Sequence, residues 1–211
     1  MSGLKRYTQL PYLLHMLSTR EITALDPRFW VDRNDAIFLQ AYQEQKELES
    51  ILILCLSRSA ATYHHWHVFA QGPAGVRIEF DEKVFNAWAA RIKNVRLERV
   101  KYLKLDPELI SQVKADELPF VKRHAFRHEG EVRLIVENPI GSPPRHSFKF
   151  EYEMIKEIIV SPWLAPPAVG SVIQAIRLAA PGSRFRIRAT TMLESELFTT
   201  PARKLRRAPL S

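Results

Sequence analysis

The sequence has a single cysteine, Cys55, among 211 residues, so no disulfide can form within the chain. One free thiol suits a reducing compartment, and we therefore expect a cytoplasmic protein. Long apolar runs are also lacking, because the longest one near the N-terminus, Leu10 to Leu17, is interrupted by Pro11 and His15. This run is too short and too polar for a signal-peptide core or a membrane span, so we expect no membrane association.

Glycine is scarce, with 7 residues, and it does not build the known phosphate-binding loops. The chain contains neither GxxxxGK[ST] nor GxGxxG, which excludes a Walker-type or Rossmann-type loop. It also lacks GxSxG, the nucleophile elbow of α/β-hydrolases. Cys55 lies inside the apolar segment ILILCL, which predicts a buried small side chain rather than a nucleophile.

Acidic residues are fewer than basic ones, 23 against 31, which leaves a net charge of +8. Such a balance favours contact with nucleic acid or another polyanion. From residue 177 to the end, eight basic side chains stand against two glutamates, a net charge of +6. The basic ones are Arg177, Arg184, Arg186, Arg188, Arg203, Lys204, Arg206 and Arg207. A solubility tail, or a surface for an acidic protein partner, would have the same composition.

Short strands and helices are interspersed along the chain. Alternating or β-branched apolar segments predict strands over residues 4–8, 20–25, 51–56, 75–80, 95–103, 132–136, 147–152, 155–160 and 185–189. Helical patterns cover residues 11–17, 36–50, 60–70, 81–92 and 166–180, and another helix starts at Asp106-Pro107. In the helix 36–50, Ile37, Tyr42 and Leu48 are the expected inward positions.

The strands lack regular βαβ spacing. This favours a mixed α+β fold with a largely antiparallel sheet over a doubly wound one. We expect one domain over residues 1–199 and a basic, mobile tail over residues 200–211.

The stretch from Arg123 to Val136, RHAFRHEGEVRLIV, carries the densest chemistry. Glu129 and Glu131 are two residues apart at the mouth of a predicted strand, so they project from the same face. Adjacent carboxylates raise each other's pKa unless cations neutralise them. The cations near in sequence are Arg123, Arg127, His128 and Arg133. One carboxylate could hold a substrate hydroxyl while the other orients a nucleophile; a solvated strand end with its own salt bridges is the alternative.

A second cluster of functional side chains is Tyr63 to His67, YHHWH. His64 and His67 have helical i, i+3 spacing, which can bring two imidazoles together. The chain has no HExxH motif and no paired cysteines, so support for a zinc site is weak and no metal is expected. An aromatic helix face could stack on a base or on nicotinamide. Packing of Trp66 and Phe69 into the core is the other interpretation.

Four ordered segments resemble the bacterial domain-of-unknown-function family 2971. They are LKRYTQLPYLLHML, CLSRSAATYHHWHVFA followed by GVRIEFD, VKRHAFRHEGEVRLIVE, and IKEIIVSPWL. The resemblance as a whole spans roughly Leu4 to Ile176. Members of that family often belong to mobile or phage-defence gene clusters. The resemblance therefore implies toxin-like or effector activity, and with it an antitoxin-like neutralising partner.

The same layout is more distantly similar to ADP-ribosyltransferases. That superfamily places a basic residue on an early strand, a serine or tyrosine at the end of a second strand and a glutamate at the start of a third. Arg6, Ser57 and Glu131 occupy those positions here, and Glu129-x-Glu131 resembles a two-glutamate motif. The segment CLSRS lacks the usual serine-threonine-serine run, and the usual Asn-Asp-Pro is split between Asp26-Pro27 and Asn34-Asp35.

This resemblance implies NAD as the substrate and a role for each residue. Glu131 would hold the ribose 2′-hydroxyl as the nicotinamide bond breaks, and Glu129 would orient the acceptor. Arg6 would hold a phosphate or ribose of NAD, and Ser57 would brace the glutamate. The aromatic side chains expected to stack on nicotinamide are Tyr7, Tyr63 and Trp66.

The expected function is that of an NAD-dependent ADP-ribosyltransferase acting as a toxin or antiviral effector. Its acceptor is a macromolecule, with nucleic acid (RNA or DNA) favoured over protein. One alternative is a metal-dependent nuclease that uses His64, His67, Glu129 and Glu131. The other is a non-catalytic nucleic-acid or protein-binding module whose affinity comes from the basic tail.

Overall fold

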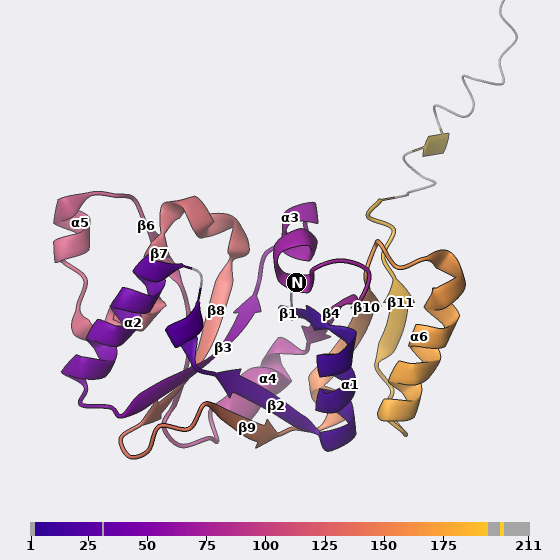
Figure 1. Cartoon of the computed structure of the whole chain (residues 1–211), viewed down its shortest axis with the longest axis horizontal. Helices are drawn as coiled ribbons and strands as arrows, with labels where there is room; N and C mark the ends of the chain where they lie inside the picture. The colour runs from indigo at the N-terminus through magenta and orange to yellow at the C-terminus, as the bar shows by residue number, and fades with distance from the viewer. Residues whose placement is uncertain (1–2, 31, 194–198, 201–211) are drawn as a thin grey trace, which may run out of the picture.

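The computed structural model describes residues 3–30, 32–193 and 199–200. The predicted tail, residues 200–211, lies outside the described residues except for Thr200. The chain forms a single α+β unit with a mostly antiparallel nine-stranded sheet, which confirms the predicted fold class (Figure 1). In the described residues, no helix is both long and apolar enough to cross a membrane.

The strands and helices alternate along the chain. The strands are β1 (Leu4–Gln9), β2 (Glu21–Leu25), β3 (Ser50–Ser57), β4 (Gly75–Phe80), β5 (Val95–Arg99), β6 (Lys101–Leu103), β7 (Val121–Arg123), β8 (Glu131–Asn138), β9 (Arg145–Lys149), β10 (Ile155–Val160) and β11 (Arg186–Ala189). The α-helices are α1 (Leu10–Thr19), α2 (Arg33–Gln45), α3 (Tyr63–His65), α4 (Glu82–Ala89), α5 (Pro107–Ser111) and α6 (Pro166–Ala179). Shorter helical turns are η1 (Pro27–Phe29), η2 (Trp66–Ala70), η3 (Ala115–Phe120), η4 (His124–Glu129) and η5 (Tyr152–Met154).

The large sheet divides at β3. Its order is β11-β10-β4-β1-β3-β2-β9, with β8 also on β3 and β5 on β8. Strand β8 pairs with the whole of β3, from Ser50 opposite Asn138 to Ser57 opposite Glu131. Strands β1 and β2 must therefore share the other edge of β3, where β1 pairs at Ser57 and β2 at Ile53. The result is two wings that meet at β3, with β8 and α2 in one and β4, β10 and β11 in the other (Figure 1).

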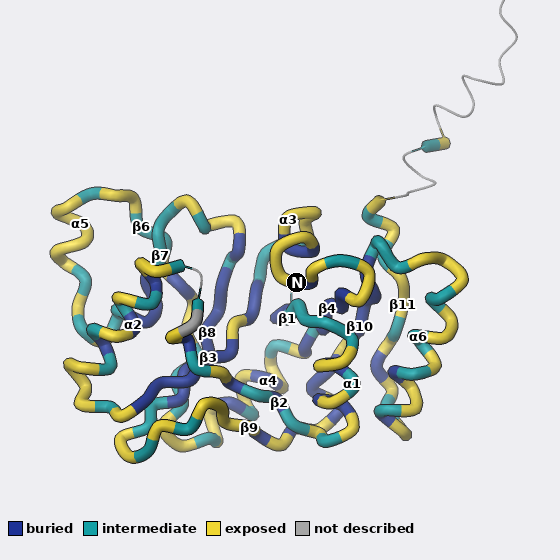
Figure 2. The backbone as a smooth tube through the Cα atoms, in the orientation of Figure 1, coloured by how far each residue is buried: buried dark blue, intermediate teal, exposed yellow. Residues whose placement is uncertain are grey.

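The main apolar core lies on one face of both wings. Strand residues such as Leu54, Ile78, Leu134 and Ile158 pack there, covered by α1, α4 and α6. Figure 2 shows that the central strands are buried while the outer surfaces of α5 and α6 are exposed. A smaller cluster fills the space between α2 and the opposite face of β3 and β8. Strands β3 and β8 are therefore covered on both faces, which explains their nearly continuous apolar sequences.

Three predictions about individual elements were wrong. Helix α2 starts at Arg33, capped by Asp32, and its buried positions are Asp35, Leu39 and Tyr42. Ile37 is 64% exposed because this register points Asp35 inward instead. Cys55 is exposed because it alternates with the core-facing Leu54 and Leu56 and borders a cavity.

Some predicted bounds also differ from the structure. The predicted strand 95–103 breaks into β5 and β6 at the buried Val100, and the predicted strand 147–152 ends at Lys149. The predicted helix 60–70 begins only at Tyr63 and continues as the π-helical turn η2. The strands 75–80 and 155–160 have their predicted bounds, because clear alternation and turn residues delimit both.

Candidate active site

A sharp turn places Glu129 and Glu131 side by side. Turn η4 ends at Glu129, Gly130 adopts a left-handed conformation with φ 52°, and β8 starts at Glu131. A Cβ on Gly130 would lie 2.2 Å from Ser59 Oγ and 3.0 Å from its backbone nitrogen. Only glycine therefore fits, by conformation and by space. The Ser57 hydroxyl donates to the Glu129 carbonyl (2.6 Å), and the Arg58 N–H donates to the Gly130 carbonyl (2.8 Å).

Five buried or nearly buried ionic side chains meet behind this turn, and we call them the ionic cluster: Asp35, Lys122, Glu129, Glu131 and Arg133. Lys122 Nζ lies 2.7 Å from Glu129 Oε2 and 3.2 Å from Glu131 Oε2. Arg133 Nε donates to Glu131 Oε1 at 2.9 Å. Arg133 also binds Asp35 through two parallel hydrogen bonds of 2.8 and 2.5 Å. Three carboxylates thus share two cations, and every member has a charged partner.

The two glutamates differ in acidity. Burial opposes ionisation of Glu131, but Arg133 and Lys122 outweigh it and lower the pKa of Glu131 to about 2. For Glu129 burial is the stronger effect: it raises the pKa, and the attraction of Lys122 compensates only in part. Burial also raises the pKa of Asp35 against the effect of Arg133. Glu131 is therefore a permanent anion at neutral pH, and Glu129 is the better proton acceptor.

These carboxylates line a cavity of about 730 Å³. This volume lies in the range of small-molecule and cofactor sites. Aromatic walls come from Tyr7, Trp30, Phe69 and Phe126. The basic side chains that line the cavity are Lys5, Arg33, Lys122 and Arg123. A ligand with planar rings and anionic groups fits this lining.

Lys5 and Arg123 are among the cations that remain available to an anion. Lys5 Nζ bonds a backbone carbonyl, Gly3 O at 3.2 Å, and burial lowers the pKa of Lys5. Among the described residues, Lys5 has no carboxylate within ion-pair distance. The Arg123 Nε is buried with no hydrogen-bond partner in the described part of the chain, and Arg123 Nη2 lies 3.8 Å from Asp32. A buried donor without a partner is costly, so a bound anion would stabilise it.

The structure brings Tyr7, Ser57, Glu129 and Glu131 to one cavity, but not Arg6. Arg6 lies between Lys5 and Tyr7 on β1, and side chains alternate along a strand. It is half-buried on the opposite face, where burial lowers its pKa to about 10. Ser57 also differs from its expected role, since its hydroxyl holds the Glu129 carbonyl and not the Glu131 carboxylate.

The aromatic helix contributes different residues from those expected. Trp66 is fully buried against Ala70 and Ile159, so its ring does not face the cavity. Tyr63 is exposed and stacks on His67 at 5.8 Å, outside the cavity lining. Val68 and Phe69 line the cavity in their place. Core packing is thus confirmed for Trp66 only.

The histidines do not form a metal site. Across residues 3–30, 32–193 and 199–200, no group of three or more His, Cys, Asp and Glu side chains could hold a metal ion. His65 is buried, stacks on Tyr7, and shares a 2.7 Å hydrogen bond with Thr62 Oγ1. Its Nε2 lies 3.5 Å from the Glu129 carbonyl, so His65 supports the turn from behind.

Sequence reasoning missed Lys5, Trp30, Asp35, Phe126 and Lys122. A signal existed for Lys5, because it shares a strand face with Tyr7, which was among the predicted residues. Lys122 directly precedes the stretch 123–136, and only the pairing of β7 with β6 turns it towards the glutamates. Asp35 is 98 residues from its partner Arg133, and no local pattern connects them.

No family model and no curated protein matches this chain, so the resemblance to domain-of-unknown-function family 2971 is not confirmed. Solved structures of DarT from Thermus sp. 2.9 are similar to it. The complex of DarT with NAD+ has a TM-score of 0.47 at 10% identity, covering 90% of this chain and 95% of DarT. The complex with ADP-ribosylated ssDNA has a TM-score of 0.47 at 12% identity, covering 90% and 94%. The functional argument therefore rests on the geometry of the site itself.

Proposed function

We propose that this protein transfers ADP-ribose from NAD to a macromolecule, with nucleic acid favoured over protein as the acceptor. The observation that carries this proposal is the pair Glu129 and Glu131 at the lining of a 730 Å³ cavity. One of the two is a permanent anion anchored by Arg133, and the other shares Lys122 with it. A fixed anion beside a more basic carboxylate suits a reaction that builds positive charge and then releases a proton.

The reaction follows from these two roles. The bond between ribose C1′ and the nicotinamide nitrogen breaks, and its electron pair leaves with neutral nicotinamide. In this proposal the Glu131 carboxylate stabilises the positive charge left on the ribose. A nitrogen or hydroxyl of the acceptor then bonds to C1′, and its proton passes to Glu129. Because Arg133 and Lys122 already hold Glu131, the site needs little reorganisation as charge develops.

The remaining lining matches the other parts of NAD. Lys5 and Arg123 provide cations for the pyrophosphate, a role expected for Arg6 in the sequence. Tyr7, Trp30 and Phe69 provide faces for the nicotinamide and adenine rings. The nuclease alternative loses support, because His64, His67 and the glutamates do not converge on a metal-binding group among the described residues.

The test is to incubate the protein with NAD labelled in its adenylate part, together with total cellular RNA, DNA and protein. We expect label in one nucleic-acid fraction with wild type and with Glu153→Gln, a control on an exposed carboxylate. Label should fall at least 10²-fold with Glu131→Gln. Equal labelling by wild type and Glu131→Gln would remove the proposal. Nucleic-acid binding that persists without any NAD turnover would select the non-catalytic binding module.

A toxin role and a neutralising protein belong to the same proposal. In this proposal ADP-ribosylation of the cell's own nucleic acid blocks its use, so the host needs an antitoxin-like inhibitor. Induced expression in a bacterial host should stop growth with wild type and not with Glu131→Gln at equal protein level. Growth arrest by both forms would separate toxicity from the transferase chemistry.

A further inference from the structure

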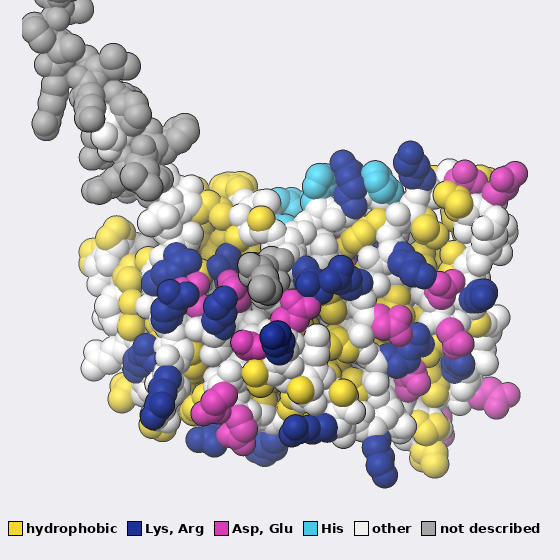
Figure 3. All heavy atoms as spheres, turned by 180° about the vertical axis from the view of Figure 1, so that it is seen from behind, with side chains coloured by type: hydrophobic (Ala, Val, Ile, Leu, Met, Phe, Trp, Pro, Cys, Tyr) yellow, Lys and Arg dark blue, Asp and Glu magenta, His cyan; other side chains and the backbone are white. Residues whose placement is uncertain are grey.

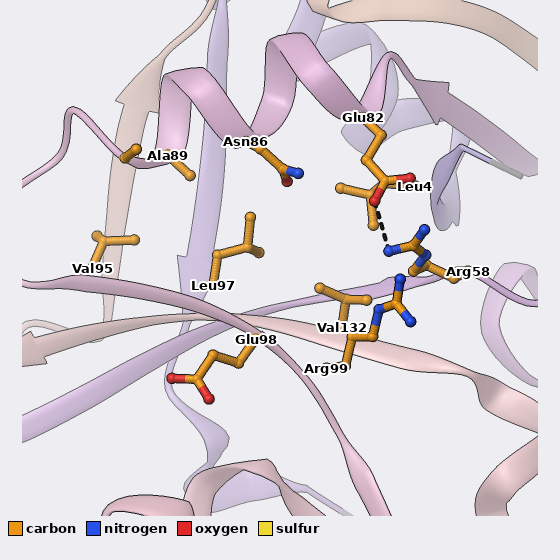
Figure 4. A pocket seen from close by; sticks show the side chains of 11 residues that line it. Leu4, Arg58, Glu82, Asn86, Ala89, Val95, Leu97, Glu98, Arg99 and Val132 are labelled. Atoms are coloured by element: carbon orange, nitrogen blue, oxygen red, sulfur yellow. Dashed lines mark ion pairs between the residues drawn. The ribbon is translucent and has the colours of Figure 1, made fainter. Parts of the chain in front are cut away.

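A second cavity of about 390 Å³ lies between α4 and β5, and we call it the α4 groove. Figure 4 shows its apolar walls, which include Leu97 and Val132, and two arginines at one end. Arg58 and Arg99 are drawn at the same end of the groove, while Glu98 points away from them (Figure 4). Asn86 adds an amide to the lining. The groove thus combines a cationic end with an apolar wall.

The charges at this end are incompletely paired. Arg58 Nη1 lies 2.6 Å from Glu82 Oε1. Arg99 is exposed and has no ion pair within the described part of the chain. Glu98 does not compensate, because Arg96 holds it at 2.8 Å. This end of the groove thus carries two positive charges and one carboxylate, and a bound anion would balance the second charge. A guanidinium binds phosphate through two parallel hydrogen bonds, so a phosphate group fits this end.

The α4 groove and the active-site cavity lie back to back at one end of the sheet. Three pairs of consecutive residues each divide between them: Leu4 and Lys5, Arg58 and Ser57, Val132 and Glu131. In each pair the first named lines the groove and the second lines the cavity, as alternation along a strand requires. A chain that turns over this end of the sheet can therefore contact both.

Backbone hydrogen bonds connect the segments of both arginines to the turn from Glu129 to Glu131. The Arg58 N–H donates to the Gly130 carbonyl at 2.8 Å. Arg99 precedes Val100, whose N–H donates to the Glu131 carbonyl at 3.0 Å. Figure 3 shows the back of the molecule, where Lys and Arg side chains gather in groups with acidic side chains between them.

We propose that the α4 groove is an acceptor subsite, which binds a phosphate-bearing nucleotide unit next to the unit modified in the cavity. The phosphate lies between Arg58 and Arg99, and the sugar or base packs on the apolar wall. This inference rests on the proposed function and adds the direction in which the acceptor strand crosses the protein. It also assigns Arg58 and Arg99 to acceptor binding, and not to NAD.

Fluorescence anisotropy with a labelled single-stranded oligonucleotide, in RNA and DNA versions of one sequence, tests this subsite. With Arg99→Glu we expect at least a tenfold weaker Kd and a shallower salt dependence, by about one unit of slope. The control Arg145→Glu makes the same charge change on β9, outside the groove, and should weaken binding less than twofold. Ala90→Trp fills the groove from an exposed position without changing charge, and should also weaken binding at least tenfold.

The transferase readout separates this inference from the proposed function. Nicotinamide release from NAD without acceptor should stay unchanged in Arg99→Glu and Ala90→Trp. Equal weakening by Arg99→Glu and Arg145→Glu would overturn the subsite, because it would show only non-specific attraction. Unchanged binding with Ala90→Trp would overturn it as well. If wild type releases no nicotinamide but the groove variants still lose oligonucleotide binding, the proposed function fails and the subsite stands as a binding site.

Discussion

The two faces of strand β8 differ in chemistry: one buries apolar side chains, and the other buries charged ones. Val132, Leu134 and Val136 pack into the main apolar core, and each contributes about 1.5–3 kcal/mol by burial. On the other face, Glu131 and Arg133 are equally buried but charged. Removing such ions from water costs several kcal/mol each, and their attraction only repays it when every partner is in place. The apolar face accounts for stability, whereas the ionic face needs a functional explanation.

The largest expected effect comes from breaking the ionic face at its centre. Arg133→Met leaves Asp35 and Glu131 buried with Lys122 alone, so we expect a loss of about 3–5 kcal/mol in the free energy of unfolding. The triple variant Asp35→Leu, Glu131→Leu, Arg133→Met removes the uncompensated charges and should recover most of that loss, but without activity. Urea denaturation with an NAD turnover assay measures both. A stable triple variant that keeps activity would contradict a catalytic role for this face.

The apolar face provides the control. Leu134→Ala creates a cavity in the main core and should cost about 2–5 kcal/mol, while activity per folded molecule stays near that of wild type. A Leu134→Ala protein that folds but loses activity would show that the two faces are coupled.

The next effect concerns the turn between the two glutamates. Gly130→Ala forces a left-handed alanine against Ser59, so we expect a loss of about 1–3 kcal/mol and of most activity. Gly182 is matched to it, because it also has a positive φ, of 77°, but a Cβ added there would meet no atom within 4 Å. Gly182→Ala should cost about 1 kcal/mol and keep activity. Thermal denaturation and turnover of both variants separate backbone strain from displacement of the carboxylates.

The smallest effect is a shift in pH dependence. Burial raises the pKa of Glu129 above its ordinary 4.5, so acidification protonates Glu129 before Glu131 and activity falls through that raised pKa. Glu131, with a pKa of about 2, stays ionised over this range. Its stabilising contribution is complete above its unfolded pKa of 4.5 and is lost as the pH falls towards 2. The fall of kcat at acidic pH should disappear in Glu129→Gln. If kcat of that variant still falls as in wild type, the titrating group is another residue.

Local patterns in the sequence predicted most of the strands and helices, and also the two glutamates of the candidate site. Alternation and turn residues gave β4 and β10 their bounds, and the spacing of Glu129 and Glu131 put both carboxylates on one face. Neutralisation by cations was also predicted, and Arg133 fulfils it, although Arg127 and His128 do not. Lys122 supplies the second cation.

The remaining errors have specific physical causes. Arg6 was predicted where Lys5 lines the cavity, because a sequence does not show which face of a strand points to a ligand. The register of α2 was wrong because it is set by the pairing of Asp35 with Arg133, which are 98 residues apart. Both depend on tertiary contacts, and neither leaves a local pattern.

Nicotinamide release tests the central claim most directly, when it is measured in a single turnover together with NAD affinity. The account predicts that wild type cleaves NAD and that Glu131→Gln binds NAD with a similar Kd but cleaves it about 10²–10³-fold more slowly. Equal cleavage rates in the two proteins, or no detectable NAD binding by wild type, would contradict it.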